Sequence, residues 1–576
     1  MKNRTDVATE VRDMENNGFV DYLNTLHNEQ ANNENALAEA QQNNPYFKKV
    51  KVERPEAQYI ANRIETGENA CLMILTGHAG DGKTTLLFQV LEKIARNISD
   101  IKVVPSGELL TNQNKKIRYI KDFSELTKDE RRLSFKKALD DAEIGIYTIL
   151  VANTGPLIDT FKDVFPDQDD AESTIIEQMD SSQAKETDLY GHRIITMNIA
   201  RIDNTTFVSE FGQKIVDESN WEHCSTCDKR DLCPIAFNAQ LVRQNKSALH
   251  FLKSFYIWEQ NLDNRATIRQ ITAHLAFALT GGLNCTRVHQ RVKPSWKAKY
   301  LFSNLLFGGT QSGDSAALQI KGVQMLSQSR IDVKNTSKDY EVLVQRNYRD
   351  LFEPALVSLC NDLEKISNQS LDVKRVLKRM LIVFPLGDDL RYEIYKDVFS
   401  TYYPDFLECA EGKSPNRPNR KMKKMILRAL RIMFTGEDIN LNESILITLR
   451  RSGEQIQNVQ MLIGRIAETD IHIELQKIPS VSDENQKYKL VLRCAENEAI
   501  TINMPLLDYF SKISSGLIVA DIDPMLSHGI ESLKAKLIAY CKPITTDPNE
   551  VSLLVREEDS WKIVRMCFED TSIESN

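Results

Sequence analysis

The sequence has no run of about 18 apolar residues, which is the length that a membrane-spanning helix needs. Its opening segment, MKNRTDVATEVRDMENN, also lacks the apolar stretch of a secretory signal peptide. These two absences argue against a membrane protein and against a secreted one. We therefore expect a cytoplasmic protein that makes no use of a membrane.

The chain has few cysteines and no net positive charge. Ten cysteines in a chain of 576 residues are too few for a disulfide scaffold. The net charge of -8 gives no sign of a generally basic nucleic-acid binder, so local basic patches would have to carry any such role. The sequence also has no internal repeat and no nuclease signature, and we expect any DNA cleavage to belong to another protein.

Five short apolar runs alternate with helical patterns in the first part of the chain. The runs cover residues 71–77, 101–106, 117–123, 146–155 and 193–199. Strands that are nearly all apolar are typical of sheets buried on both faces, and the alternation is typical of βαβ units. We predict an α/β fold with a five-stranded parallel sheet and helices on both faces.

The first run leads into a phosphate-binding motif. Residues 77–84 match G-x-x-x-x-G-K-[ST] at every fixed position and precede the helical pattern TTLLFQVLEKIA. In such a loop the backbone N–H groups and the helix N-terminus face phosphate, Lys83 reaches the β- and γ-phosphates, and Thr84 binds Mg²⁺. No N-K-x-D guanine signature is present, which favours ATP over GTP. The predicted ATP contacts are Gly77, His78, Ala79, Gly80, Asp81, Gly82, Lys83, Thr84 and Thr85.

Hydrolysis also requires an acid for Mg²⁺ and a group that orients water. Asp122 stands at the end of the third run, Glu125 lies three residues later, and Asn153 ends the fourth run. We predict that Asp122 binds Mg²⁺, that Glu125 is the base and that Asn153 holds the attacking water. Alternatively, Asp122 is a strand-end cap, Glu125 a helix-start acid and Asn153 a turn residue.

The order of these elements resembles the AAA fold, with a P-loop after the first strand, an acid after the third and an Asn after the fourth. In the usual AAA pattern a Glu directly follows the acid, whereas Phe123 stands there in this chain. The resemblance implies an arginine finger at Arg193 or Arg201 and a second sensor at Arg269, in the lid-like helix ATIRQITAHLAFAL. Each of these arginines is otherwise a surface ion-pair partner. A finger would act in a homo-oligomer, which the sequence leaves open.

A cysteine cluster follows the predicted sheet. Cys224, Cys227 and Cys233 have C-x₂-C-x₅-C spacing, which in an intracellular protein favours a metal over disulfides. Zinc takes four ligands, and Cys285 is the best fourth, with His223 as the alternative. Because Cys233 precedes a proline, as cysteines of iron–sulfur sites do, structural Zn²⁺, an iron–sulfur cluster and no metal all remain open.

Two basic patches stand out from the acidic chain. Residues 287–299 carry Arg287, Arg291, Lys293, Lys297 and Lys299 beside Trp296 and Tyr300, and residues 413–431 read KSPNRPNRKMKKMILRALR. Such clusters suit contact with the phosphate backbone of DNA, while neighbouring aromatic rings can stack on bases. The alternative is that each patch is a solvated helix face.

These patterns predict five parts of the chain. The parts are a flexible N-terminal arm (1–45), a P-loop ATPase core (46–220), a Cys cluster with a helical lid (221–310), a helical domain (311–465) and a C-terminal α+β domain (466–576). Within the arm, Phe19, Val20, Tyr22, Leu23 and Leu26 have helical spacing. That patch is either a helix packed on the next domain or a separate docking motif.

A family resemblance joins several of these features. The stretch NPYFKKVKVERPEAQYIANRIETG into ILTGHAGDGKTTLL, with IKDFSE, ILVANTGPL, CSTCDKRDLCP and ATIRQITAHLAFALTGGLNC, resembles the DptF-like ATPases of DNA phosphorothioation-dependent restriction systems over about residues 46–310. The resemblance implies a bacterial defence ATPase that works with partner proteins to restrict DNA lacking the backbone sulfur modification. It also implies nucleotide-binding roles for Gly77, Gly80, Gly82, Lys83 and Thr84, and site roles for Asp122 and Asn153.

Three functions therefore remain as hypotheses. The first is an ATPase that acts on DNA within a restriction complex. The second is a signalling ATPase of the STAND kind, which senses a phage protein and oligomerises. The third is a scaffold that binds nucleotide without turnover, which the missing Glu beside Asp122 makes conceivable.

Overall fold

The computed structural model describes residues 16–27, 44–97, 101, 106–180, 184, 186–309, 316–365, 372–413, 420–449, 457–478, 487–494, 499–517, 522–558, 560–569 and 572–575. The chain forms two compact units, which meet in the sequence between Ile394 and Tyr395. No helix among the described residues is long and apolar enough to cross a membrane.

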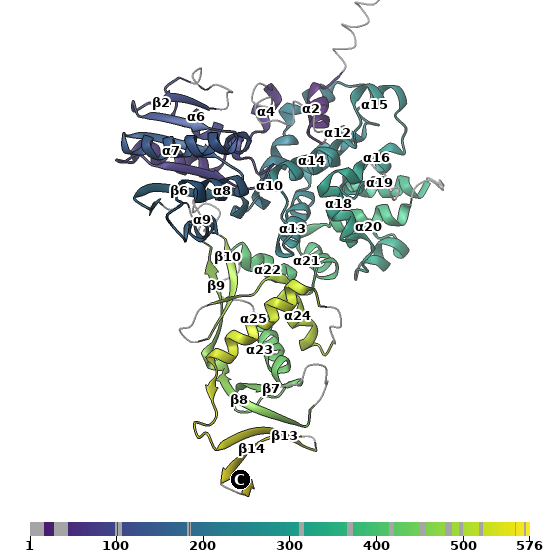
Figure 1. The fold of residues 1–576 in the computed structure, drawn as a ribbon. Helices are drawn as coiled ribbons and strands as arrows, with labels where there is room; N and C mark the ends of the chain where they lie inside the picture. The colour runs from purple at the N-terminus through teal and green to yellow at the C-terminus, as the bar shows by residue number, and fades with distance from the viewer. Residues whose placement is uncertain are drawn as a thin grey trace, which may run out of the picture. The chain divides into compact units, whose positions relative to one another are not determined.

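The first unit contains a six-stranded mixed sheet (Figure 1). In spatial order the strands are β2 (Ser106–Leu110), β3 (Lys116–Ile120), β4 (Ile146–Val151), β1 (Leu72–Thr76), β6 (His192–Asn198) and β5 (Glu186–Leu189). The four central strands are parallel, while β2 and β5 run antiparallel at the edges. The fold is therefore α/β with a mostly parallel sheet.

The prediction of five parallel strands was wrong at both edges of this sheet. Residues 102–105 of the run at 101–106 lie outside the described residues, and the edge strand β2 begins at Ser106. At the other edge, Tyr190 and Gly191 both have positive φ, 53° and 84°, which is the two-residue turn that closes a hairpin between β5 and β6. This tight turn reverses the chain between β5 and β6, and the five-residue connection 111–115 reverses it between β2 and β3, so both edge strands are antiparallel.

Helices cover both faces of the sheet because alternate residues of each central strand point to opposite sides. Met73 and Leu75 face a core that includes α5 (Pro55–Thr66) and α6 (Lys83–Ile94). Leu72 and Ile74 face the opposite core, beneath α7 (Lys128–Glu143), α8 (Thr154–Val164) and α9 (Ala171–Asp180). The resulting layers bury β1 completely and fix the position of the loop that follows it.

A helical region completes the first unit around α14 (Ile268–Thr280), whose residues from Ala273 to Thr280 are all buried. Helix α14 packs against α2 (Gly18–Leu26), α10 (Thr205–Ile215), α12 (Pro234–Gln244), α17 (Phe302–Leu306) and α18 (Lys321–Gln328). Its fully buried His274 is hydrogen-bonded to the Tyr256 hydroxyl at 2.8 Å and to the Leu306 carbonyl at 2.9 Å. Further helices of this unit are α13 (Ser247–Asn261), α15 (Cys285–Arg291), α16 (Trp296–Lys299), α19 (Pro354–Lys365) and α20 (Val373–Val383), with α21 (Gly387–Val398) at the change of unit.

The N-terminal arm contributes α2 to this packing. Phe19 and Leu23 are fully buried, and the Phe19 ring meets the Trp221 ring edge-on at 5.7 Å between centroids. Residues 16–27 are thus part of the first unit. This agrees with the interpretation of the apolar patch in the arm as a helix packed on the next domain. The rest of the predicted arm up to residue 43 lies outside the described residues.

The second unit combines helices with two antiparallel sheets. One sheet has the order β11-β10-β9, from β9 (Ile471–Lys477), β10 (Tyr488–Cys494) and β11 (Ile500–Thr501). The other has the order β12-β8-β13-β14-β15, with β7 on β8, from β7 (Ser444–Leu449), β8 (Val459–Ala467), β12 (Lys542–Pro543), β13 (Glu550–Glu557), β14 (Ser560–Glu569) and β15 (Ser572–Ser575). The helices are α22 (Tyr403–Ala410), α23 (Arg420–Thr435), α24 (Met504–Ser514) and α25 (Pro524–Tyr540). Residues 311–465, grouped as one domain in the sequence analysis, are thus divided between the two units.

The turn at Gly191 provides a test of the hairpin. A Cβ added there meets nothing within 4 Å, so Gly191→Ala should destabilise the protein only through its positive φ, by about 1 kcal/mol. Gly155→Ala is the matched control, because that position is equally open but lies in the first turn of α8, where alanine is the better residue. In urea unfolding, the free energy of unfolding of Gly191→Ala should lie below that of the parent protein, and that of Gly155→Ala should equal or exceed it. Equal effects of the two substitutions would contradict the turn.

Candidate nucleotide and metal sites

The first candidate site is the loop between β1 and α6. β1 is buried along its whole length and ends at Thr76, and α6 begins at Lys83. The loop therefore lies at the carboxyl end of a central parallel strand, with β4 on one side and β6 on the other. In open α/β sheets, ligands bind at this edge, where the strand order reverses.

The three glycines of the loop all have positive φ, at 144° for Gly77, 88° for Gly80 and 81° for Gly82. A Cβ on Gly77 would stand 3.1 Å from the Ala200 nitrogen, and one on Gly80 would stand 3.2 Å from the Thr267 hydroxyl. Both the backbone conformation and the close neighbours therefore exclude larger residues. These contacts also show that two distant chain segments pack directly on the loop.

The side chain of Asp81 points into the protein and is 1% exposed. It accepts a hydrogen bond from the His78 backbone at 3.0 Å and one from Arg265 at 2.7 Å. Arg265 also donates to the carbonyls of Ile199 and Ile202, at 3.1 and 3.2 Å. This buried ion pair braces the loop against the segment after β6 and the segment before α14. His78 and Ala79 form the exposed tip of the loop.

Lys83 is buried beneath the loop. Its ammonium donates to the carbonyl of Gly77 at 2.9 Å and to that of His78 at 2.8 Å. Burial lowers the pKa of Lys83, while the nearby Asp81 carboxylate acts in the opposite direction. Thr84 and Thr85 follow in the first turn of α6 and are partly exposed.

The remaining predicted catalytic residues lie on neighbouring strand ends. β3 is next to β4, and β4 is next to β1, so Asp122 and Asn153 stand at the same edge of the sheet as the loop. The Asn153 backbone N–H donates to the Ser124 hydroxyl at 2.7 Å, which joins the two strand ends. Asp122 lies 3.3 Å from the Lys121 ammonium, and Glu125 is exposed. Phe123 is fully buried in the core, so the position after Asp122 serves packing.

The three predicted arginines do not all lie near the loop. The Arg269 backbone N–H donates to the Gly80 carbonyl at 3.2 Å, at the start of α14, whose Thr267 and Gln270 form a capping box. Arg201 follows β6 and pairs with Asp180. Arg193 lies opposite Asp188 of β5, at the end of β6 away from the loop. The sequence reasoning missed Arg265, since nothing local marks its pairing with a residue 184 positions away.

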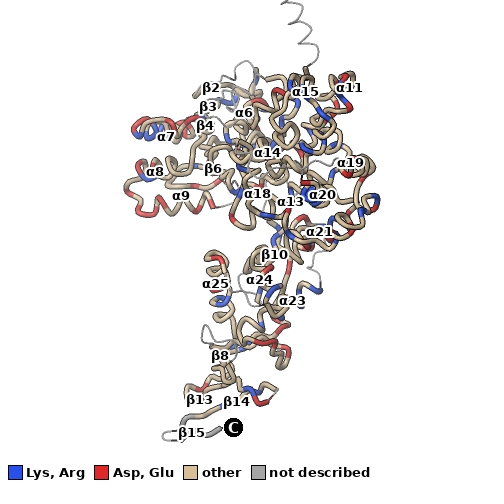
Figure 2. The backbone as a smooth tube through the Cα atoms, turned by 90° about the vertical axis from the view of Figure 1, so that its right-hand side faces the viewer, with Lys and Arg blue, Asp and Glu red and all other residues tan. Residues whose placement is uncertain are grey.

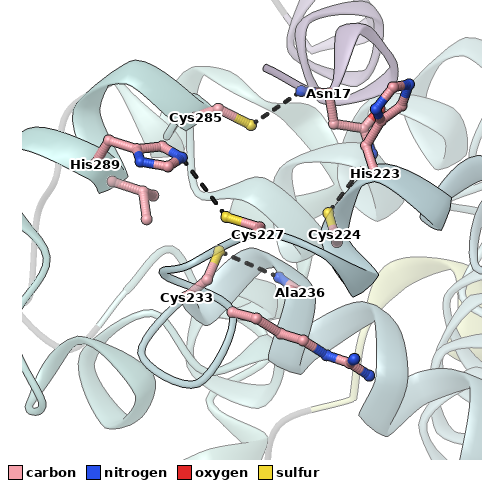
Figure 3. Close-up of a pocket in the computed structure, with 10 residues that line it drawn as sticks. Asn17, His223, Cys224, Cys227, Cys233, Ala236, Cys285 and His289 are labelled. Carbon is pink, nitrogen blue, oxygen red and sulfur yellow. Dashed lines mark hydrogen bonds between the residues drawn. The ribbon is translucent and has the colours of Figure 1, made fainter. Parts of the chain in front are cut away.

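The second candidate site collects the four predicted cysteines around one pocket, drawn in Figure 3. Cys224 lies on α11 (Glu222–Ser225), Cys227 follows it, and Cys233 caps α12. Cys285, the predicted fourth ligand, begins α15 and reaches the same pocket from 52 residues further along the chain. His223, the alternative ligand, lines the pocket as well.

Backbone and side-chain N–H groups point at three of the four sulfur atoms. The Asn17 backbone donates to Cys285 at 3.4 Å, its side chain to Cys224 at 3.7 Å, and the Ala236 backbone to Cys233 at 3.5 Å. Burial raises the pKa of Cys224, and it raises the pKa values of Cys233 and Cys285 to about 11. Neighbouring thiols contribute to each of these increases.

His289 is a candidate ligand that the sequence analysis missed. Its Nε2 lies 3.6 Å from the sulfur of Cys227, and its Nδ1 lies 3.5 Å from Asp228. Among the described residues, Cys227, Asp228 and His289 form the group of three metal-binding atoms that all lie within 4.8 Å of one another. The sequence did contain a signal for this ligand, because Cys285 and His289 are four residues apart and therefore lie on the same face of one helix.

Some cations of the two basic patches contact other side chains of the chain. In the first patch, Lys297 lies over the Phe237 ring at 5.1 Å, whereas Arg287 and Arg291 are exposed on α15. In the second, residues 414–419 lie outside the described residues, Arg428 and Arg431 pair with Asp438, and the side chains of Arg420 and Lys424 are exposed. Figure 2 shows basic and acidic residues interspersed along the helices.

The Asp81–Arg265 pair makes a testable prediction. Arg265→Ala leaves a buried carboxylate without its cation and should lower the free energy of unfolding by about 3 kcal/mol. Arg265→Lys keeps the charge without the forked geometry and should have an intermediate effect. Arg201→Ala, which removes the exposed pair with Asp180, is the control and should cost less than about 1 kcal/mol. Equal urea midpoints for Arg265→Ala and Arg201→Ala would refute the bracing role.

Comparison with known proteins adds no relative. No family model, no curated protein and no solved structure matches the chain. The function must therefore be inferred from the two sites and from the chemistry that their residues support.

Proposed function

We propose that the chain binds and hydrolyses ATP at the loop formed by residues 77–84, as a P-loop ATPase of the AAA-like class. Support comes from one observation above all. Three glycines with positive φ follow a buried parallel strand, and a buried lysine opens the next helix. That combination gives inward-facing backbone N–H groups, a helix N-terminus and a cation at one place, which are the groups that bind phosphate.

Each residue of the loop has a distinct role in this proposal. The Lys83 ammonium, now held by the carbonyls of Gly77 and His78, turns outward to the β- and γ-phosphates. The Thr84 hydroxyl binds Mg²⁺, which neutralises the phosphate charge. Asp81 does not touch the nucleotide; it keeps the loop in shape through Arg265.

The catalytic groups come from the adjacent strand ends. Asp122 completes the Mg²⁺ site, and Asn153 orients the attacking water. Glu125 is the proposed base, because Phe123 is buried and Glu125 is the exposed carboxylate of the same short helical turn. The hydrogen bond from Asn153 to Ser124 keeps this turn beside the β4 end.

The arginines extend the proposal to an assembly. Arg269, whose backbone already contacts the loop, serves as the second sensor. Arg193 and Arg201 are the candidate fingers for a neighbouring copy in a homo-oligomer. The exposed side chain of Arg201 is bound to Asp180 and would have to leave this partner.

The biological setting rests on the family resemblance. We propose that this ATPase works with partner proteins to restrict bacterial or phage DNA that lacks phosphorothioate modification. The exposed cations at the start of α23 are the favoured DNA contact of the second unit. Arg287 and Arg291 on α15 are the corresponding candidates in the first unit.

A scaffold that binds ATP without turnover is the second candidate. Phe123 favours it, since this buried ring occupies the position where the usual pattern has the catalytic carboxylate. Measurements of binding and of turnover on the same preparation separate the two functions.

The decisive variant is Lys83→Ala. We expect it to lower steady-state ATP hydrolysis by about a hundredfold or more, because the γ-phosphate loses its main cation. Lys93→Ala is the matched control; it lies on the same helix, and its ammonium pairs with Glu53 away from the loop. Turnover that survives Lys83→Ala would refute the site. ATP binding without turnover in the wild type and in the control, with and without DNA, would favour the scaffold.

DNA contact predicts a salt-dependent effect. Replacing Arg420 and Lys424 together by alanine should weaken binding of duplex DNA and make the dependence of log K on log salt shallower by about 2. The control replaces Lys534 and Lys562, which pair with Glu531 and Glu557 in the same unit. An unchanged slope in the first pair would exclude this surface as the DNA contact. Turnover that ignores DNA altogether would favour the signalling class.

A further inference from the structure

The cysteine pocket is built from three separate parts of the chain. Cys224, Cys227 and Cys233 come from the segment before α12, Cys285 comes from the start of α15, and Asn17 comes from the segment before α2. Figure 3 shows the side chains of the four cysteines around the same space. Four thiols from distant positions converge in this way when they share one ligand.

The spacing of the sulfur atoms distinguishes the possible ligands. A tetrahedral zinc ion with Zn–S bonds of about 2.3 Å holds its thiolates about 3.8 Å apart. Among the described residues, no three of the thiol sulfurs lie within 4.8 Å of one another, since the group that meets this limit is Cys227, Asp228 and His289. The four thiol sulfurs are thus spread further apart than the thiolates of a bound zinc ion. A four-iron cluster, whose corners carry the ligands, keeps its thiolates further apart.

The surroundings of the thiols also suit a cluster. Three sulfurs accept N–H hydrogen bonds from Asn17 and Ala236, and such bonds stabilise the negative charge of cluster thiolates. Arg230 lines the pocket and supplies positive charge, and Ala236 and Val288 supply an apolar wall. Cys233 is followed by Pro234, which opens α12.

We propose that Cys224, Cys227, Cys233 and Cys285 bind a [4Fe–4S] cluster, each thiol losing its proton as its sulfur binds one iron. The cluster has a structural role. It joins the N-terminal segment at Asn17 to the amino ends of α12 and α15, and α2 and α12 both pack on α14. The amino end of α14 contacts the nucleotide loop, so the cluster holds in place the helices that support that loop.

The first test is the composition of the wild-type chain purified without oxygen. We expect about four iron atoms and four acid-labile sulfides per chain, with the broad visible absorbance of an iron–sulfur cluster. One zinc per chain without iron would overturn the proposal, and so would the absence of both metals. This measurement does not depend on ATP hydrolysis, so its failure is distinct from failure of the ATPase.

Two variants test the ligand set. Cys285→Ser should lower iron and sulfide together to well below one cluster per chain, because serine is a poor ligand for a cluster. Cys541→Ser is the matched control, since this partly exposed thiol lies in the other unit and should leave the iron content unchanged. Equal iron contents in both variants would exclude Cys285 as a ligand.

His289→Ala tests whether the imidazole is the fourth ligand in place of a thiol. If the four thiolates are the ligands, the iron and sulfide contents of His289→Ala should stay at the wild-type level. Loss of the cluster in His289→Ala together with its retention in Cys285→Ser would refute the proposed set of ligands.

Discussion

The buried pair of Asp81 and Arg265 is the interaction on which the loop between β1 and α6 depends. Asp81 is 1% exposed, and its carboxylate accepts hydrogen bonds from Arg265 and from the His78 backbone, with the Lys83 ammonium nearby. Arg265 in turn binds the carbonyls of Ile199 and Ile202, so one guanidinium connects the loop, the end of β6 and the approach to α14. A buried charge is costly without its partner, and these three segments therefore keep their positions together.

Helix α14 links the two candidate sites. Its amino end donates from Arg269 to Gly80 of the loop, and its carboxyl end lies five residues before Cys285. Its thirteen helical residues span about 20 Å. The loop and the cysteine pocket consequently lie at opposite ends of one element, and the packing of α2 against that element adds the N-terminal segment to the same assembly.

The arrangement of the strand ends explains why Phe123, and not a carboxylate, directly follows Asp122. Phe123 fills the core beneath α7, so the chain turns outward only after it and presents Glu125 two residues later, at the end of the same short helical turn. Ser124, between these two residues, is bound to the backbone of Asn153. Packing thus occupies the position beside Asp122, and the proposed base is the exposed Glu125.

The sequence by itself determined the features whose causes are local. The apolar runs place β1, β3, β4 and β6, the glycine pattern places the loop before Lys83, and the C-x₂-C-x₅-C spacing places three of the pocket thiols. The tertiary structure alone decided the antiparallel edge strands, the pairing of Asp81 with Arg265 and the approach of Asn17 and His289 to the cysteines. Periodicity and motif spacing act over a few residues, whereas these contacts join groups up to 268 positions apart and exist only once the core has packed.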